Sequence, residues 1–401
     1  MKKNNILPCV IGLGYVGLPI LVRLAKKFNV NGFDINQERI EFLKKKIDLN
    51  NEVKEFLLNK KITSSLTSKI SDCKKCNFFI LCIPTPISKN KNPDLKKLSK
   101  ACKDLSKILK KGDIVFIEST VYPGVTKNIC EKLLSKKNGL VPGKDFHLGY
   151  SPERINPGDK VNTISNISKI VAYPYKAKKD IVFKVYKEIS KKLFFTKNIK
   201  EAEVAKCVEN IQRDLNIGLI NEILLVCKKM KINFEEVINL ASTKWNFIRF
   251  KPGLVGGHCL PVDPYYFSYI AKKNQINTNI LLAGRKTNEN MKLEIINDLK
   301  RYIRKNFKKF PSIVFAGLTY KENVADLRNS LSMNIYNYFK KNYRNVQGYD
   351  PIIHKKISKK IGIVNSTKNL KKFDLFVILT RHNQIKKQSR KLKAKVYDYF
   401  N

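Results

Sequence analysis

The segment "VIGLGYVG", residues 10–17, constrains the fold of this 401-residue chain more than any other stretch. It completes a short apolar run, and the residues after it place Leu18, Leu21, Val22 and Ala25 at helical spacing. Glycine at the junction permits a tight turn that residues with a side chain resist. The pattern therefore predicts a buried strand, a glycine turn and a helix near the start of the chain.

The three glycines of this segment have the spacing of a dinucleotide-binding loop. Gly12 allows the turn, Gly14 lets a pyrophosphate approach the backbone, and Gly17 lets the helix pack on the strand. The free N–H groups of the helix would face the phosphates. Asp34 ends a second predicted strand, "NVNGFDIN", where a carboxylate binds ribose hydroxyls. A turn-forming aspartate is the alternative, but the context favours NAD, since Asp34 would repel the 2′-phosphate of NADP.

The N-terminus also has two features of a signal peptide, a basic start and no charged residue from Asn4 to Pro19. Its glycines and Pro19, and the lack of a small-residue cleavage site, favour the strand, turn and helix instead. No other segment approaches the roughly 18 apolar residues of a membrane span. We therefore expect a cytoplasmic protein that does not insert into a membrane.

Strand and helix patterns alternate through the first half of the chain. After the first two strands, apolar runs occur in "NFFILCIPT", "DIVFIEST", "HLGYSPER" and "KIVAYP". Such runs, separated by helical patterns, predict a parallel sheet covered on both faces.

A helical region and a second alternating region follow. One long helix is predicted from Glu201 to Lys231, where apolar side chains recur at helical spacing at Val204, Val208, Ile211, Leu215 and Leu219. Strand candidates then return in "PSIVFAGLTY", "NVQGYDP", "FDLFVILTR" and, more weakly, "AKVYDYF". The predicted plan is α/β, helical, α/β.

The composition raises other classes of protein. The net charge is +46, with 79 Lys and Arg against 33 Asp and Glu. Because the lysines are spread along the chain without interleaved aromatic residues, we interpret them as solvated surface rather than a nucleic-acid interface. Cys73 and Cys76 form a C-x-x-C pair with no second pair, so no metal site is predicted.

One cysteine stands in an unusual setting. The stretch "GLVGGHCLPVDPYY", from Gly253 to Tyr266, places Cys259 between a glycine pair and Asp263. A thiol on backbone that glycine shapes is typical of a nucleophile approached closely by a ligand. A tight turn with a buried, inert cysteine is the alternative.

Six motifs occur in order along the chain: "CIPTP" (82–86), "ESTVYPGVT" (118–126), "SPERINPG" (151–158), "KCVENIQRDLNIGLINE" (206–222), "GGHCLPVDPYY" (256–266) and "GLTYKENVADLRNS" (317–330). Together they resemble the UDP-glucose/GDP-mannose dehydrogenase family, and most of all its branch that oxidises UDP-N-acetylhexosamines for surface polysaccharides. The resemblance implies two Rossmann-like doubly wound domains joined by a central helical region with one long helix. The expected domains are NAD-binding (1–199), helical with the cysteine loop (200–300) and UDP-sugar-binding (301–401).

The resemblance implies a four-electron oxidation of the sugar C6 alcohol to a carboxylate, using two NAD⁺. The intermediate aldehyde has no hydride to give until a nucleophile adds to it. A thiolate forms a thiohemiacetal, whose oxidation leaves a thioester that water hydrolyses.

The same resemblance assigns catalytic residues. Cys259 is the expected nucleophile, and Asp263 is expected to orient water or a neighbouring lysine. Lys206 and Asn210, at i and i+4 on the long helix, share one face. Lys206 would stabilise oxyanions on the sugar carbon, and Asn210 would hydrogen-bond the same region; a solvated helix face is the alternative. Thr120 and Glu153 are expected to position water, with Glu153 as the base, although Glu153 could instead pair with Arg154.

Further contacts follow from the matched motifs. The cofactor site is expected to include Gly12, Gly14, Tyr15, Val16, Gly17, Asp34, Pro84, Thr85, Thr120, Lys321 and Arg328. The substrate site is expected to include Glu153, Arg154, Lys206, Asn210, Arg213, Gly256 and Lys321. Lys321 and Arg328 could equally be surface charges. The long helix is expected to form the seam of a homodimer or higher homo-oligomer, as in the family.

Two features of the cysteine loop favour N-acetylhexosamines over UDP-glucose. Leu260, Pro261 and Val262 stand where UDP-glucose enzymes carry a bulky residue and a lysine, and His258 replaces a common serine. His258 either lowers the pKa of Cys259 or only shapes the loop. UDP-N-acetylmannosamine and UDP-glucose remain alternative substrates. A dehydrogenase that transfers a single hydride would not need Cys259 together with Lys206.

Overall fold

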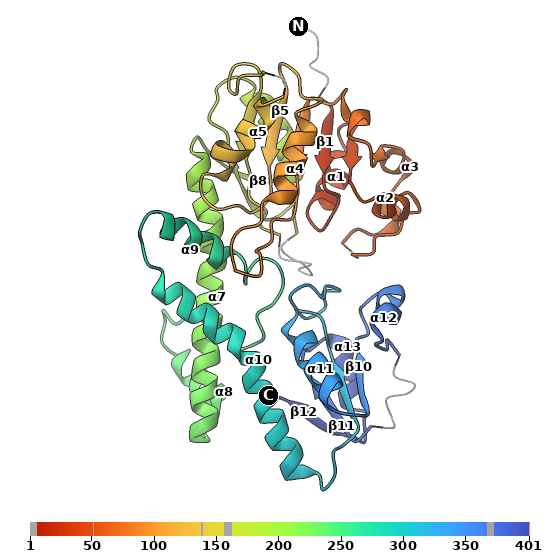
Figure 1. Cartoon of the computed structure of the whole chain (residues 1–401), viewed down its shortest axis with the longest axis vertical. Helices are drawn as coiled ribbons and strands as arrows, with labels where there is room; N and C mark the ends of the chain where they lie inside the picture. The colour runs from red at the N-terminus through yellow and green to blue at the C-terminus, as the bar shows by residue number, and fades with distance from the viewer. Residues whose placement is uncertain (1–5, 51, 138, 156–162, 367–372, 401) are drawn as a thin grey trace. The chain divides into compact units, whose positions relative to one another are not determined.

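The computed structural model describes residues 6–50, 52–137, 139–155, 163–366 and 373–400 (Figure 1). The chain divides into two compact units, one of Met1–Glu209 with Tyr265–Ile276 and one of Asn210–Pro264 with Asn277–Asn401. Each unit has its own sheet. The predicted α/β class, with two sheets joined by a helical region, is confirmed; the three predicted domain boundaries stay a prediction.

The first unit contains an eight-stranded sheet in the order β3-β2-β1-β4-β5-β6-β7-β8. Its strands are β1 (Pro8–Ile11), β2 (Asn31–Phe33), β3 (Leu66–Thr67), β4 (Phe78–Leu81), β5 (Ile114–Ile117), β6 (His147–Tyr150), β7 (Ser168–Ala172) and β8 (Lys192–Thr196). Every residue of β1, β4, β5 and β6 is buried, as the continuous apolar runs predicted.

Helices cover both faces of this sheet. The α-helices are α1 (Gly17–Leu24), α2 (Gln37–Lys44), α3 (Lys60–Thr63), α4 (Lys96–Leu105), α5 (Glu131–Ser135) and α6 (Lys179–Ile189). Two 3₁₀ helices, η1 (Glu55–Leu57) and η2 (Ile70–Cys73), and one π-helix, η3 (Thr126–Cys130), lie between them. The residues of α1 and α6 join one apolar core, and those of α4 and α5 join another. Two cores, one on each face, make this a doubly wound sheet.

The prediction of a wholly parallel sheet is wrong at one place. Strands β1 to β6 are mutually parallel, but β7 runs antiparallel to β6 and β8 follows β7 in parallel. Parallel neighbours need a crossover, usually a helix, and the described residues between β6 and β7 contain none. The strands β3 and β8, at the two edges of the sheet, were also not predicted.

Four helices make up the central region: α7 (Ile199–Met230), α8 (Phe234–Ala241), α9 (Asp263–Lys273) and α10 (Asn279–Asn306). The long helix predicted at 201–231 is confirmed as α7. Its predicted apolar stripe, however, is not buried, because Val208 is 49% exposed and Leu219 57% exposed, and Val204, Ile211 and Leu215 are only partly buried. The buried positions of α7 include polar residues such as Lys206, Asn210 and Asp214.

The second unit carries a four-stranded parallel sheet in the order β10-β9-β11-β12. Its strands are β9 (Ile313–Ala316), β10 (Val346–Tyr349), β11 (Leu375–Ile378) and β12 (Lys395–Asp398), and its helices are α11 (Leu331–Asn342), α12 (Lys355–Ile361) and α13 (Asn383–Ser389). Side chains of α10 and α11 pack on one face, and Ile385 of α13 packs on the other.

Among the described residues, no helix has both the length and the apolar character needed to cross a membrane.

Candidate active site

The predicted cofactor residues of the first unit lie at one edge of its sheet. The glycine loop follows β1, Asp34 follows β2, Pro84 and Thr85 follow β4, and Thr120 follows β5. These strands are parallel, so their carboxyl ends meet at the same edge. The strand order reverses between β1 and β4. Ligands of doubly wound sheets bind outside the carboxyl ends at such a switch point.

The three loop glycines are explained by different contacts. Gly12 has φ of +92°, and a Cβ there would lie 2.6 Å from the carbonyl oxygen of Cys82. A Cβ on Gly17 would collide with the carbonyl oxygen of Gly12. At Gly14, by contrast, a Cβ would meet no protein atom within 4 Å. The fold itself does not require glycine at Gly14, which fits a backbone kept open for a pyrophosphate.

Asp34 is placed to serve the ribose of a dinucleotide. Its carboxylate accepts hydrogen bonds from the N–H of Leu13 (2.9 Å) and of Asn36 (2.9 Å). Each oxygen retains a further acceptor site for a hydroxyl group. Tyr15 and Val16 are the last two residues of the glycine loop before α1, which begins at Gly17. The residues present therefore fit a bound NAD.

Side-chain and backbone hydrogen bonds tie the loops after β4 and β5 together. The hydroxyl of Thr85 donates to the carbonyl oxygen of Thr120 (2.5 Å), and the N–H of Ile83 donates to Oγ of Ser119 (2.9 Å). The hydroxyl of Tyr266 donates to the carbonyl oxygen of Thr85 (2.5 Å). Thr85 and Thr120, both predicted cofactor residues, are thus in contact.

Glu153 follows β6 and is 8% exposed. Its Oε1 accepts the N–H groups of Arg154 (2.7 Å) and Ile155 (2.5 Å), whereas Oε2 is buried and has no hydrogen-bond partner among the described residues. The guanidinium of Arg154 pairs with Glu209 (2.8 Å). The alternative of a simple Glu153–Arg154 ion pair is therefore wrong.

Sequence reasoning missed the actual partners of Glu153. Nζ of Lys169, in β7, lies 3.6 Å from Oε2 of Glu153 and 2.6 Å from Oε2 of Glu118, which follows β5. Burial raises the pKa of Glu118 to about 7. A lysine inside the apolar strand "SKIVA" and a glutamate directly after "IVFI" were the available signals.

Lys206 and Asn210 are both buried on α7, at 6% and 8% exposure, whereas Arg213 is exposed. The solvated-face alternative is therefore wrong for Lys206 and Asn210 in this structure. Nδ2 of Asn210 donates to Oδ2 of Asp263 (2.5 Å), and Asp263 is 1% exposed. The structure thus brings together two predicted catalytic residues that are far apart in sequence.

The cysteine loop is shaped by the motif at 317–330, within the second unit. Gly257 has φ of +87°, and a Cβ there would lie 2.8 Å from the ring of Tyr320. A Cβ on Gly256 would lie 2.7 Å from the carbonyl oxygen of Asn329, whose side chain donates to the carbonyl oxygen of Gly257 (2.8 Å). Only glycine allows this close packing.

Cys259 lies in the loop that precedes α9, separated from its first residue, Asp263, by Leu260, Pro261 and Val262. Its carbonyl oxygen accepts the N–H groups of Val262 and Asp263, each at 2.9 Å. The side chain is partly exposed, unlike those of Cys207 and Cys227, which are buried. These contacts fix the backbone of Cys259 at the start of a helix while solvent still reaches the residue.

Arg328, a predicted cation of the 317–330 motif, pairs with Asp326. Its guanidinium forms a bidentate ion pair, with Nη2 2.7 Å from Oδ2 and Nε 3.1 Å from Oδ1 of Asp326. The carbonyl oxygen of Lys321 accepts the hydroxyl of Thr319 (3.1 Å). Arg328 thus closes a turn with Asp326, and this pairing does not test its predicted contact with the cofactor.

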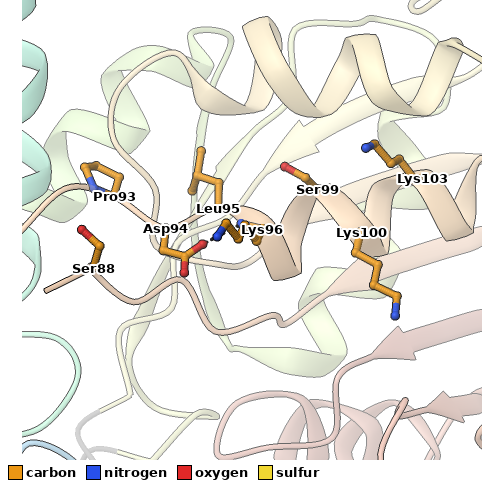
Figure 2. A pocket seen from close by; sticks show the side chains of 8 residues that line it. All are labelled: Ser88, Pro93, Asp94, Leu95, Lys96, Ser99, Lys100 and Lys103. Carbon is orange, nitrogen blue, oxygen red and sulfur yellow. Dashed lines mark hydrogen bonds between the residues drawn. The ribbon is translucent and has the colours of Figure 1, made fainter.

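A surface hollow of about 550 Å³ lies at the start of α4 (Figure 2). Its lining residues are Ser88, Pro93, Asp94, Leu95, Lys96, Ser99, Lys100 and Lys103. None of them is a predicted site residue, so the hollow is not part of the candidate site. Within the described ranges, no three His, Cys, Asp or Glu side chains gather as a metal site would require.

Comparison with known proteins identifies domain families over most of the chain. Residues 6–190 match the NAD binding domain of the UDP-glucose/GDP-mannose dehydrogenase family, residues 200–290 its central domain, and residues 314–401 its UDP binding domain.

Individual relatives agree with these matches. The chain is 45% identical to UDP-N-acetyl-D-glucosamine 6-dehydrogenase of Pseudomonas aeruginosa, over 85% of this chain and 82% of that protein. It is 40% identical to the UDP-N-acetyl-D-glucosamine 6-dehydrogenase of Salmonella typhi, over 94% of this chain and 90% of that protein. The solved structure of UDP-D-ManNAc dehydrogenase from Pyrococcus horikoshii superimposes with a TM-score of 0.86 and 30% sequence identity. The superposition covers 99% of this chain and 96% of that chain. The chain therefore belongs to the UDP-glucose/GDP-mannose dehydrogenase family and is an NAD-dependent nucleotide-sugar 6-dehydrogenase.

Proposed function

We propose that this enzyme oxidises the C6 alcohol of a UDP-N-acetylhexosamine, with GlcNAc or GalNAc as the sugar, to the corresponding uronate for surface polysaccharide synthesis. The two relatives named UDP-N-acetyl-D-glucosamine 6-dehydrogenase are 45% and 40% identical to the chain over the aligned residues, against 30% for the structure named as a UDP-D-ManNAc dehydrogenase. The residues Leu260, Pro261 and Val262 support the same choice over UDP-glucose.

One observation carries the proposed four-electron chemistry, namely the setting of Cys259. Glycines that the fold requires shape its loop, its carbonyl oxygen accepts the N–H of Asp263, the first residue of α9, and the residue stays partly exposed. A buried, inert cysteine needs none of these features. Four residues on, Asp263 is held by Asn210.

The residues divide the chemistry between them. The glycine loop and Asp34 would hold NAD, which would supply the hydride acceptor for both oxidation steps. The ammonium of Lys206 stabilises the negative charge that develops on the sugar oxygen. The sulfur of Cys259 adds to the aldehyde carbon, and the resulting thiohemiacetal is oxidised to a thioester.

Water completes the reaction. Glu153 takes a proton from a water molecule that Thr120 helps to position, and the water oxygen bonds to the thioester carbon. The carbon–sulfur bond then breaks and frees Cys259 with the carboxylate product. Asn210 and Asp263, as a hydrogen-bonded pair, orient the groups around Cys259.

The test combines product counting with one substitution. We expect two NADH per UDP-GlcNAc or UDP-GalNAc at full conversion, measured by absorbance, because each sugar carbon gives up two hydrides. Cys259→Ser should bind both substrates but lose several orders of magnitude in turnover, since a serine hydroxyl is a weaker nucleophile. Cys227→Ser, in a buried cysteine of α7, is the matched control.

Several outcomes would contradict the proposal. One NADH per sugar, with free aldehyde, would exclude the covalent route, and near-normal turnover of Cys259→Ser would make Cys259 a packing residue. Faster turnover of UDP-ManNAc or UDP-glucose than of UDP-GlcNAc and UDP-GalNAc would reassign the substrate.

The exposed apolar face of α7 supports a homodimer. Val208, Leu219 and Val226 are 49%, 57% and 52% exposed, although apolar side chains on one helix normally face a core or a partner. A second copy of this chain is the expected partner. Light scattering should give twice the mass of one chain, and Leu219→Glu should lower that mass; a wild-type monomer would contradict the idea.

A further inference from the structure

Three buried charged side chains meet at the carboxyl edge of the larger sheet. Lys169 is 1% exposed, Glu118 is 1% exposed and Glu153 is 8% exposed. The ammonium of Lys169 donates to Oε2 of Glu118 (2.6 Å) and to the carbonyl oxygen of Pro152 (3.3 Å). One proton of the ammonium remains for Oε2 of Glu153, 3.6 Å away.

The reversed strand β7 explains how a lysine reaches this position. The last residue of β6, Tyr150, pairs with the last residue of β7, Ala172, in antiparallel register. Continuing that register by three residues on each segment sets Glu153 opposite Lys169. β7 thus lies alongside the segment that follows β6, and a parallel strand would have carried Lys169 elsewhere.

We propose that Lys169 and Glu118 are positioning residues that set the pH range in which Glu153 accepts a proton from the hydrolytic water. The inference rests on the proposed function, since it assumes that Glu153 is the base for thioester hydrolysis. With both carboxylates ionised, the three groups carry a net charge of minus one. Uptake of one proton makes them neutral.

The charges of the cluster are strongly coupled through these short distances. Burial raises the pKa of Glu118 to about 7, with Glu153 also raising it and Lys169 opposing the rise. Burial works against the charge of Lys169, but the two carboxylates outweigh it and raise the pKa of Lys169. The proton taken from water is therefore held by the cluster rather than by one residue.

Two other titratable groups face the cluster, Tyr186 from α6 and Cys82 after β4. The hydroxyl of Tyr186 donates to Oε1 of Glu118 (2.8 Å). Burial raises the pKa of both Tyr186 and Cys82, so both stay neutral near pH 7. The charge of the cluster is thus set by Lys169, Glu118 and Glu153.

Two substitutions should move the pH dependence of hydrolysis in opposite directions. Glu118→Gln mimics the protonated form of Glu118 and removes a like charge beside Glu153. The acidic limb of the pH–rate profile, where the hydrolysis rate falls as the pH is lowered, should therefore shift down by about one pH unit. Lys169→Met removes the cation between two carboxylates, so the limb should shift up by about one unit. The rate is measured as the decay of the thioester, followed by intact mass after acid quench of a single turnover.

A matched control tests whether any buried acid would do the same. Asp113 lies before the opposite end of β5, is 1% exposed and pairs with Lys110 at 3.2 Å. Asp113→Asn should leave the limb in place, because Asp113 does not contact the cluster. A limb that stays in place in Glu118→Gln would overturn the inference, even if Lys169→Met fails to fold.

Failure of the proposed function gives a different result. In that case the wild-type enzyme forms no thioester on Cys259 or yields one NADH per sugar, and both proposals fall together. If the wild type yields two NADH and a thioester, but Glu118→Gln and Asp113→Asn behave alike, only the role of the cluster is rejected.

Discussion

Each of the two sheets carries a buried carboxylate just after a strand, and the two carboxylates are held differently. Asp350 follows β10, and its oxygens accept the N–H groups of Leu318 (2.7 Å), Thr319 (3.3 Å) and Ile352 (3.1 Å). Glu118 follows β5 and is held by the side chains of Lys169 and Tyr186. Backbone donors cannot change their protonation, whereas side-chain donors can.

The difference separates an acid that organises loops from one that can exchange charge. Asp350 also lies 3.3 Å from Nε2 of His382, whose Nδ1 accepts the N–H of Asn323 (2.8 Å). Its contacts thus fix the start of the 317–330 motif, which packs on the cysteine loop. Glu118 instead shares its lysine with Glu153. Buried acids at equivalent sheet edges therefore need not have equivalent roles.

The largest expected effect concerns the acid held by backbone. Asp350→Asn places an NH₂ group against backbone donors in either amide orientation, so at least one buried N–H loses its acceptor. We expect the free energy of unfolding to fall by about 3 kcal/mol, measured by chemical denaturation. Asp374 is exposed, and its carboxylate accepts the N–H of Ser312 (2.8 Å). Asp374→Asn should therefore lower the free energy of unfolding by about 1 kcal/mol or less. Equal losses of stability in Asp350→Asn and Asp374→Asn would contradict the structural role given to Asp350.

A smaller effect should appear as a pH dependence of stability. Glu118 has a pKa of about 7 in the folded chain against an ordinary value of 4.5, so the folded state binds more protons between these values. Its stabilising contribution is complete below about pH 4.5 and is lost as the pH rises through 7. Between pH 5 and pH 8 the wild type should lose roughly 2 to 3 kcal/mol relative to Glu118→Gln.

Denaturation of the two proteins side by side at several pH values checks this. The contribution of Lys169 to stability does not change in this window, because its pKa is raised from 10.5 and its stabilising effect is lost only at higher pH. A difference between the two proteins that stays constant from pH 5 to pH 8 would show that Glu118 keeps its charge in the folded state.

The smallest effect compares two buried tyrosines. Tyr186 donates to Glu118 (2.8 Å), and Tyr349 of β10 donates to Gln388 (2.5 Å). Tyr186→Phe and Tyr349→Phe should each lose about 1 kcal/mol of stability. Only Tyr186→Phe should move the acidic limb of hydrolysis, in the same direction as Glu118→Gln but by a few tenths of a unit. A similar shift in Tyr349→Phe would indicate a general effect of destabilisation.

The sequence was sufficient where local pattern decides the structure. The apolar runs around Phe79, Val115 and Phe376 predicted buried strands because both faces of such strands are covered. The glycine spacing predicted the loop after β1, where Gly12 has φ of +92° and Gly17 packs on the backbone of Gly12. The ordered motifs also led to Asn210 and Asp263, which the structure joins by a hydrogen bond.

Other features depend on contacts that a single sequence does not display. The direction of β7, antiparallel to β6, cannot be read from its sequence, because its apolar pattern is the same in either direction. Lys169 resembles the many surface lysines of this chain, and its partner Glu118 lies 51 residues away. β8 was missed because none of its residues is fully buried, so it lacks the continuous apolar run of the predicted strands. The exposed side of α7 was not predictable, because helical spacing marks an apolar face but not what covers it.

The open space beside Gly14 has a consequence for laboratory evolution of this enzyme. Gly14 is absent from the residues with positive φ, and a Cβ there would meet no protein atom within 4 Å. Alanine at such a position restricts the unfolded chain and commonly adds about 0.4–1 kcal/mol of stability. A screen for heat resistance without cofactor would therefore favour Gly14→Ala and discard the binding site. Selection for thermostability should keep the dinucleotide present at every round.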